Sequence, residues 1–290
     1  MDLKNKTILV TGASSGVGLE LVKKLLPLGA QVIGTARASS LPRFKQAGVA
    51  SDRFFPRELD VASVQSREAL YGDVHRAFGG VDVLINNAGI NYRAVVEHMD
   101  LRAQAEQIEV NYVGPFHLIQ LFLPDMRAPG RGHVVNVSSV GGMMAMPTMA
   151  GYSASKFALE GASESLWYEM KPWNIKVSLV QPGFINSGGF QRVKRTPQSD
   201  ASEHVAAEPY HQYYEAMGRF IEKMMTGTSA TSEGVADVIL KTLKRKNPPL
   251  RVPATPDAVA FYYLRRLLPR RLYHRILFRN LPEIDKWVQG

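Results

Sequence analysis

The chain has 290 residues, of which 45% are hydrophobic and 21% charged, a composition typical of an ordinary soluble globular protein. It contains no cysteine, which excludes disulfides, thiolate nucleophiles and sulfur-ligated metal sites. The net charge of +9 comes from the end of the chain, because residues 1–240 hold 23 basic and 23 acidic side chains whereas residues 241–290 hold 12 and 3. No apolar run is long enough for a secretory signal or a membrane span, so we expect a cytoplasmic protein.

Short apolar runs alternate with helix-like stretches over the first 185 residues. This alternation predicts an α/β fold of the Rossmann type, in which a doubly wound parallel sheet is covered by helices on both faces and three layers result. We predict one nucleotide-binding catalytic domain over residues 1–250, with its ligands at the carboxyl ends of the strands. The first helix is expected to end at Gly29, and the expected strands are residues 6–10, 30–35, 53–59, 81–85, 132–137 and 175–180.

Two further segments belong to the end of the chain. Residues 184–232 are polar with little apolar periodicity, above all at 196–200, and we predict a mobile lid over the substrate there. Residues 251–290 are predicted to form a basic helical extension, in which apolar and arginine positions interleave over 258–279. We expect this segment to pack its apolar side on the enzyme and leave its arginines in water. The alternative is peripheral contact with an anionic membrane, and no motif points to nucleic acid.

A glycine-rich loop lies directly between the first strand and the first helix. Residues 11–18 read TGASSGVG, and the missing side chains let the backbone approach a pyrophosphate at the amino end of the helix. Nucleotides with a free ribose usually meet an acidic residue at the end of the second strand. Here Ala36 and Arg37 stand at that place, and an arginine can pair with a 2′-phosphate. The sequence therefore favours NADP(H) over NAD; a plain tight turn with a solvated Arg37 is the alternative.

Tyr152 and Lys156 are four residues apart in a stretch of helical character, so their side chains share one face. A free tyrosine, with a pKa of about 10, is a poor acid–base group at neutral pH, and a nearby ammonium lowers that pKa. The pair is thus suited to proton transfer at a carbonyl oxygen. Taken alone, this spacing is also common on helix surfaces.

Five motifs follow one another at the ends of the predicted strands: the glycine loop, residues 86–89 (NNAG), Ser138 and Ser139, the pair of Tyr152 and Lys156, and residues 182–183 (PG). In these motifs, over residues 5–190, the sequence closely resembles the short-chain dehydrogenase/reductase family in its single-domain form. Residues 139–142 and 156–161 resemble the 17β-hydroxysteroid and retinol dehydrogenase branch. The resemblance implies hydride transfer between a nicotinamide and a carbonyl or secondary alcohol carbon, in a homodimer or homotetramer.

The resemblance also implies roles for individual residues. Tyr152 is then the acid–base group, and Lys156 is its partner and holds the ribose hydroxyls. Ser139, which we prefer to Ser138 because of strand alternation, binds the substrate oxygen, and Asn111 keeps a water in the proton relay. Besides Tyr152, Lys156 and Arg37, the implied cofactor contacts are Gly12, Ser14, Ser15, Gly16, Val17, Gly18, Asp60, Val61, Asn87, Ala88, Gly89, Pro182, Gly183, Ile185 and Ser187, the last in a place where the family often has threonine. No metal site is predicted.

The expected substrate is a small hydrophobic ketone or alcohol, for example steroid-like or retinoid-like. Four methionines, at 143, 144, 146 and 149, lie between Ser139 and Tyr152 and either form a soft pocket wall or are ordinary core residues. A catalytically silent nucleotide-binding sensor or scaffold is the alternative function. An isomerase or dehydratase acting on nucleotide sugars is disfavoured, because the stretch after Phe184 offers too little organised sequence for a second lobe.

Overall fold

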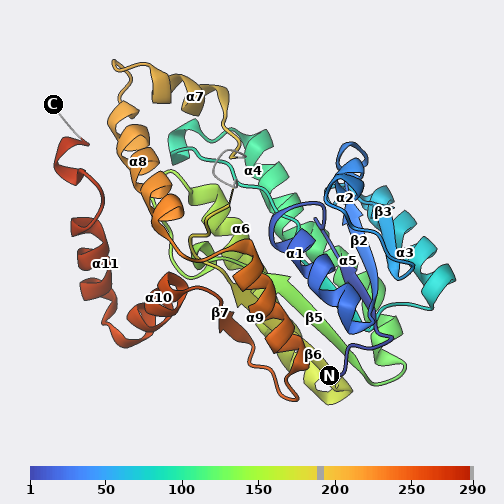
Figure 1. Cartoon of the computed structure of the whole chain (residues 1–290). Helices are drawn as coiled ribbons and strands as arrows, with labels where there is room; N and C mark the ends of the chain where they lie inside the picture. The colour runs from blue at the N-terminus through green and yellow to red at the C-terminus, as the bar shows by residue number, and fades with distance from the viewer. Residues whose placement is uncertain (188–192, 288–290) are drawn as a thin grey trace.

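A single parallel sheet runs through the computed structural model, which describes residues 1–187 and 193–287 (Figure 1). Its strand order is β3-β2-β1-β4-β5-β6-β7, the doubly wound arrangement predicted from the sequence. The six predicted strands are present to within two residues at each end, and a seventh was not predicted. The strands are β1 Thr7–Val10, β2 Gln31–Ala36, β3 Phe54–Glu58, β4 Val83–Asn86, β5 Gly132–Val137, β6 Ile175–Gln181 and β7 Arg251–Pro253.

Helices cover both faces of the sheet and make the outer two of three layers. Apolar residues of α1 and α9 pack on one face, and those of α3, α5 and α6 pack on the other. The central strands β1, β4 and β5 are buried along their whole length, which explains their continuous apolar runs. The helices are α1 Gly16–Leu25, α2 Pro42–Gln46, α3 Val64–Phe78, α4 Leu101–Ile108, α5 Gly114–Arg127, α6 Ala150–Met170, α7 Pro197–His204, α8 His211–Gly227, α9 Ser232–Lys244, α10 Pro256–Leu267 and α11 Arg270–Arg279.

The segment predicted as an irregular lid contains two helices, α7 and α8. Helix α7 begins in the stretch expected to be least structured, so that expectation was wrong. Thr196 Oγ1 accepts a hydrogen bond from the Ser199 amide and Ser199 Oγ accepts one from the Thr196 amide, which together form a capping box. The polar residues at 196–200 therefore form the start of a helix and not a loop. Mobility of this lid stays a prediction.

The end of the chain contributes to the sheet before it forms helices. Strand β7 pairs in parallel with β6, so the sheet extends past residue 250, where we expected the catalytic domain to end. Ala258 of α10 and Tyr273 of α11 are buried in a cluster with Val140, Met143 and Met144. Figure 1 shows these two helices, in red, beyond β7 at the outer edge of the molecule.

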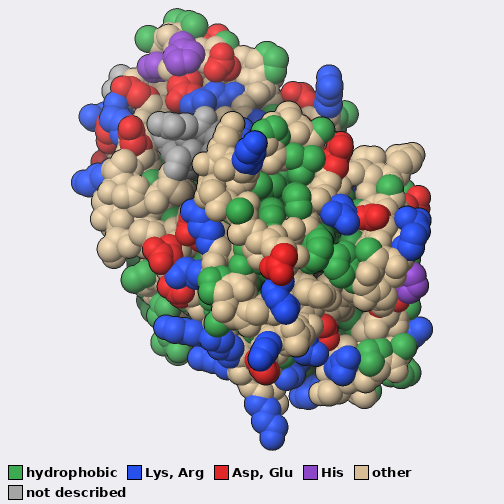
Figure 2. Space-filling view, turned by 45° about the vertical axis from the view of Figure 1, so that its right-hand side comes forward, with side chains coloured by type: hydrophobic (Ala, Val, Ile, Leu, Met, Phe, Trp, Pro, Cys, Tyr) green, Lys and Arg blue, Asp and Glu red, His purple; other side chains and the backbone are tan. Residues whose placement is uncertain are grey.

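An apolar stripe of α10 faces outward. Val259, Tyr263 and Leu267 are 41%, 56% and 76% exposed and lie one turn apart. Most basic side chains of the chain end occupy two places: on α10 and α11, and at the carboxyl end of α9, where Figure 2 shows Lys and Arg gathered at the bottom of the view. Within the described ranges, no helix has both the length and the apolar character needed to cross a membrane.

Candidate active site

The glycine loop at the carboxyl end of β1 is shaped to admit a ligand's phosphates. Gly12 and Gly16 have φ angles of 61° and 55°, in the left-handed region that favours glycine. A Cβ at Gly18 would lie 2.5 Å from the Gly12 carbonyl oxygen, so no side chain fits there. The first turn of α1, residues 16–19, carries only uncharged residues and directs its backbone amides toward the loop. An anion at this helix end would be stabilised by those amides and by the helix dipole.

Thr11 and Asn87 fasten this loop to the turn after β4. Thr11 Oγ1 accepts hydrogen bonds from the amides of Asn87 and Ala88 at 2.9 and 3.0 Å. In return, Asn87 Nδ2 donates to the carbonyl oxygens of Thr11 and Gly12 at 3.0 and 3.2 Å. The sequence analysis quoted Thr11 as part of the loop but did not predict it as a site residue. The two turns therefore form one rigid floor beneath the expected nucleotide.

The residues predicted to meet the adenine end lie at the same edge of the sheet. Ala36, the last residue of β2, is 5% exposed, and Arg37 after it is exposed. Asp60, which follows β3, is exposed and accepts a hydrogen bond from the Ala62 amide, whereas Val61 is buried. A dinucleotide fits this set, because the glycine loop leaves space for a pyrophosphate and Arg37 is open to a 2′-phosphate.

Tyr152 and Lys156 of α6 meet Ser139 at the end of β5. Lys156 Nζ donates to the Val137 carbonyl oxygen at 2.9 Å and lies 6.0 Å from the centroid of the Tyr152 ring. A Cβ at Gly141 would lie 2.9 Å from Tyr152 Cε1, so the glycine lets the ring pack closely beside Ser139. Both Ser139 and Tyr152 line one pocket.

Ser138 points elsewhere. Its hydroxyl donates to Glu160 Oε1 at 2.9 Å inside the core, and Gln181 Nε2 donates to the same oxygen at 2.7 Å. Alternation along β5 thus places Ser139, and not Ser138, beside Tyr152.

Burial has the largest effect on the pKa values of Tyr152 and Lys156. It raises the pKa of Tyr152, an effect that the hydrogen bond with the Ser139 side chain opposes. It lowers the pKa of Lys156 to about 8, against the opposing charge of Glu160. The lowering of the tyrosine pKa that the sequence predicted is therefore not found, because burial raises that pKa instead. At neutral pH Tyr152 carries its proton, which is the form that can act as an acid toward a carbonyl oxygen.

Asn111 lies behind this pair in a π-helical turn, Glu109–Val113, between α4 and α5. Its Oδ1 accepts from the Ile90 amide, and its Nδ2 donates to the Ile90 carbonyl oxygen and to Ser155 Oγ, each at 2.9 Å. A Cβ at Gly89 would lie 3.2 Å from Asn111 Oδ1 and 3.8 Å from Lys156 Nζ. Such single π-helical turns often mark functional sites. The predicted relay residue therefore lies next to the lysine.

The turn after β6 is held by the end of the chain. The Gly183 amide donates to Thr255 Oγ1 at 2.8 Å, and the Phe184 amide donates to Asp257 Oδ2 at 2.9 Å. On the other side, the Pro182 carbonyl oxygen accepts from the Val140 amide at 2.7 Å. The sequence analysis missed Thr255 and Asp257, because no local pattern signals a contact across more than seventy residues.

The pocket at Tyr152 has a volume of about 210 Å³ and is mainly apolar. Ile185 and Ser187, predicted as cofactor contacts, line it together with Met144, Met146 and Met149, whereas Met143 lies in the buried cluster with α10. Arg93, which was not predicted, also lines this pocket although it is 2% exposed. Its Nη2 donates to the Tyr214 carbonyl oxygen at 2.7 Å.

Comparisons with known proteins agree with this geometry. The family described as short chain dehydrogenase matches residues 6–198. A 3-ketodihydrosphingosine reductase from Bacteroides thetaiotaomicron is 36% identical over 88% of this chain and 89% of its own. The human 17-beta-hydroxysteroid dehydrogenase type 1 is 32% identical over 95% of this chain and 87% of its own.

Solved structures share the whole fold. A short-chain dehydrogenase from Streptomyces avermitilis superposes with a TM-score of 0.80 at 32% identity and covers 96% of each chain. A short chain dehydrogenase/reductase from Burkholderia phymatum in complex with NAD has a TM-score of 0.79 at 23% identity, over 97% of this chain and 98% of its own. A metagenomic short-chain oxidoreductase in complex with NADP has a TM-score of 0.67 at 25% identity, over 88% of this chain and all of its own.

Proposed function

Because the chain belongs to the short-chain dehydrogenase/reductase family and is an oxidoreductase with a nicotinamide nucleotide as cofactor, we propose that it is NADP(H)-dependent and acts on the carbonyl or secondary alcohol of a hydrophobic substrate. The observation that carries this proposal is that Ser139 and Tyr152 line one apolar pocket, with the Lys156 ammonium behind the Tyr152 ring. NADPH, when bound, supplies the hydride.

The chain's own residues supply orientation and the proton. The Ser139 hydroxyl holds the substrate oxygen next to the Tyr152 hydroxyl, which donates its proton to that oxygen during reduction. The Lys156 ammonium, fixed by the Val137 carbonyl oxygen, holds the ribose hydroxyls and stabilises the phenolate that forms. Asn111, next to Lys156, keeps the path by which a proton returns to the tyrosine.

The proposed preference for NADP(H) is supported by the two residues at the end of β2. A buried alanine stands where a carboxylate would repel a 2′-phosphate, and the exposed Arg37 is free to pair with that phosphate through its guanidinium. Solved relatives contain either NAD or NADP, so the family alone does not decide between them.

The proposal of a hydrophobic substrate is supported by the residues that line the pocket. Met144, Met146, Met149, Phe184 and Ile221 line the space in front of Tyr152. Methionine side chains adapt to apolar ligands of different shape. The names of two relatives, which specify a ketodihydrosphingosine and a hydroxysteroid, support the same substrate class.

The test is the loss of NADPH absorbance with a panel of ketones, aldehydes, steroids and retinoids, run in parallel with NADH. We expect turnover of apolar ketones with a kcat/KM at least about tenfold higher for NADPH, equivalent to one charge-assisted contact with the 2′-phosphate. Equal or better use of NADH would overturn the cofactor assignment. Nucleotide binding without turnover of any ketone or alcohol, in either direction, would instead favour the silent sensor.

A further inference from the structure

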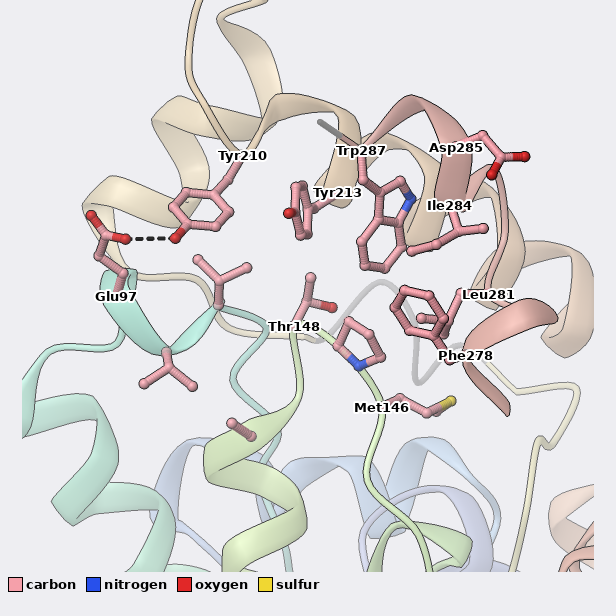
Figure 3. Close-up of a pocket in the computed structure, with 14 residues that line it drawn as sticks. Glu97, Met146, Thr148, Tyr210, Tyr213, Phe278, Leu281, Ile284, Asp285 and Trp287 are labelled. Carbon is pink, nitrogen blue, oxygen red and sulfur yellow. Dashed lines mark hydrogen bonds between the residues drawn. The ribbon is translucent and has the colours of Figure 1, made fainter. Parts of the chain in front are cut away.

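A second cavity, of about 810 Å³, lies beside the catalytic pocket (Figure 3). Its walls come from residues 95–97, from Met146, Pro147, Thr148 and Ala150 around the start of α6, from Tyr210 and Tyr213 of α8, and from the end of the chain between Phe278 and Trp287. The residues of α8 and of the chain end lie outside residues 6–198, the part that matches the family. Half of the lining residues therefore lie outside that matched part.

Specific contacts hold the wall that the chain end supplies. The rings of Tyr213 and Trp287 lie 4.4 Å apart, and Trp287 Nε1 donates to the Pro282 carbonyl oxygen at 2.9 Å. Arg219 of α8 pairs with Glu283 at 2.8 Å, and Trp287 is only 7% exposed. Figure 3 shows these rings facing one space together with Phe278 and Leu281. Side-chain contacts within the chain thus hold this wall in place.

The floor of the cavity carries backbone strain. Thr148 lines the cavity with a φ of 65°, a left-handed conformation that a β-branched residue rarely adopts. Its carbonyl oxygen accepts from the Ala94 amide, which fixes the strained turn in place. Backbone strain of this kind is found most often at active sites and ligand-binding sites.

Met146 joins the two spaces, since it lines both the catalytic pocket and the second cavity. The catalytic pocket has about 210 Å³. This is less than the roughly 300–1,000 Å³ of ordinary small-molecule sites, a range in which the second cavity lies. A ligand of ordinary size that reacts at Tyr152 therefore has to extend past Met146, whose flexible side chain can move aside.

Two features narrow the class of ligand. Met146 is the one lining residue that the two spaces share, and a thin methylene chain fits past such a flexible side chain more easily than a fused ring system does. Glu97 and Asp285 are the charged residues of the cavity lining, and both are acidic, so a carboxylate at the far end of the chain would be repelled.

We propose that the second cavity, which we name the distal chamber, binds the neutral alkyl chain of a long-chain ketone whose carbonyl lies at Tyr152. This inference rests on the proposed function. Each methylene that enters the chamber raises kcat/KM about threefold to fourfold, until the chain fills it.

The kinetic test compares methyl ketones of increasing length, from butanone to hexadecan-2-one, and a long oxo acid with its carboxylate at the far end. We expect kcat/KM to rise with length in the unchanged protein and to be lower for the oxo acid than for the ketone of equal length. In Ile284→Trp, which puts a larger ring into the path of the alkyl chain, the ratio of long-chain to butanone kcat/KM should fall several-fold. Leu267→Trp, the same kind of change on the exposed face of α10, should keep that ratio.

A binding test needs no turnover. A long-chain ketone with bromine at its chain end should quench the emission of Trp287, and Trp287→Phe should remove that quenching while Trp167 and Trp173 still emit. Reduction of butanone with no gain for longer ketones, or an equal gain in Ile284→Trp, would overturn the chamber and leave the proposed function standing. Failure of every ketone to react, with quenching intact, would overturn the function alone.

Discussion

Lys156 and Glu160 are both buried and lie one helical turn apart on α6, so an ammonium and a carboxyl group share the core beneath the catalytic pocket. The ammonium donates to the Val137 carbonyl oxygen, and the carboxyl group accepts from Ser138 and Gln181. Burial lowers the pKa of the lysine, which the Glu160 charge opposes, and raises that of the glutamate, which the hydrogen bonds from Gln181 and Ser138 and the Arg251 guanidinium oppose.

This relationship predicts the alkaline limit of nucleotide use. With its pKa lowered to about 8, Lys156 carries its charge below pH 8 and loses it above. We expect kcat/KM for NADPH, which reports groups of the free enzyme, to fall as pH rises through about 8. Glu160→Gln removes the charge that supports the ammonium, so the midpoint should move to lower pH. Glu169→Gln, an exposed change near the end of the same helix, should leave it in place, and an unmoved midpoint in both variants would contradict the coupling.

Cofactor choice should respond to the end of β2. Ala36→Asp puts a carboxylate where the 2′-phosphate is expected, and Arg37→Ala removes the proposed cation. Each should lower kcat/KM for NADPH by about 10- to 100-fold, the equivalent of a hydrogen bond to a charged group, with little loss for NADH. Arg43→Ala, a change on nearby α2, is the control. Unaltered preference in Arg37→Ala would mean that the 2′-phosphate is held elsewhere.

Thr255 should act on the cofactor through the turn after β6. Thr255→Val leaves the Gly183 amide without its partner, which costs about 1–3 kcal/mol of stability. We expect a lower Tm and a severalfold higher KM for NADPH. The matched control is Thr242→Val on α9, whose hydroxyl bonds only to its own helix, and which should lower Tm without changing that KM. The same KM in both variants would assign Thr255 a purely structural role.

We also expect the outer face of α10 and α11 to bind anionic membranes. Val259, Tyr263 and Leu267 are exposed there, and arginines are the charged residues of positions 258–279. Co-sedimentation with phosphatidylserine vesicles should be weakened at least about tenfold by the double change Arg270→Glu and Arg271→Glu, since each basic residue contributes about 1 kcal/mol. The double change Lys244→Glu and Lys246→Glu, at the end of α9, should have little effect. Equal binding to uncharged phosphatidylcholine vesicles would contradict this expectation.

The features of the fold that could be predicted are those decided by residues close together in the sequence. Six strands, the end of the first helix at Gly29 and the positions of Ser139, Tyr152 and Lys156 follow from periodicity and motifs within short windows. Strand β7 was missed because three residues give no periodic signal, and their pairing with β6 is decided by distant sequence. The direction of the Tyr152 pKa was missed for a related reason, since it depends on burial and not on the spacing to the lysine.

The distal chamber could not be predicted at all. It exists because Trp287 packs against Tyr213 and because Glu283 pairs with Arg219, contacts that join the chain end to α8. In the sequence these residues stand in a basic tail and in a polar segment that suggested a lid. The apolar side of α10 and α11 was expected to pack on the enzyme, and the cluster at Val140 and Met143 shows where it does.

The most direct test of the central claim is Tyr152→Phe, measured for NADPH binding and for turnover of a reactive ketone. Phenylalanine keeps the ring that packs against Gly141 and removes only the hydroxyl. We predict unchanged enhancement of NADPH fluorescence on binding and a loss of turnover of about 100- to 10,000-fold, the usual contribution of a general acid. Turnover within a few fold of the unchanged protein would show that the proton comes from another group, and the proposed chemistry would be contradicted.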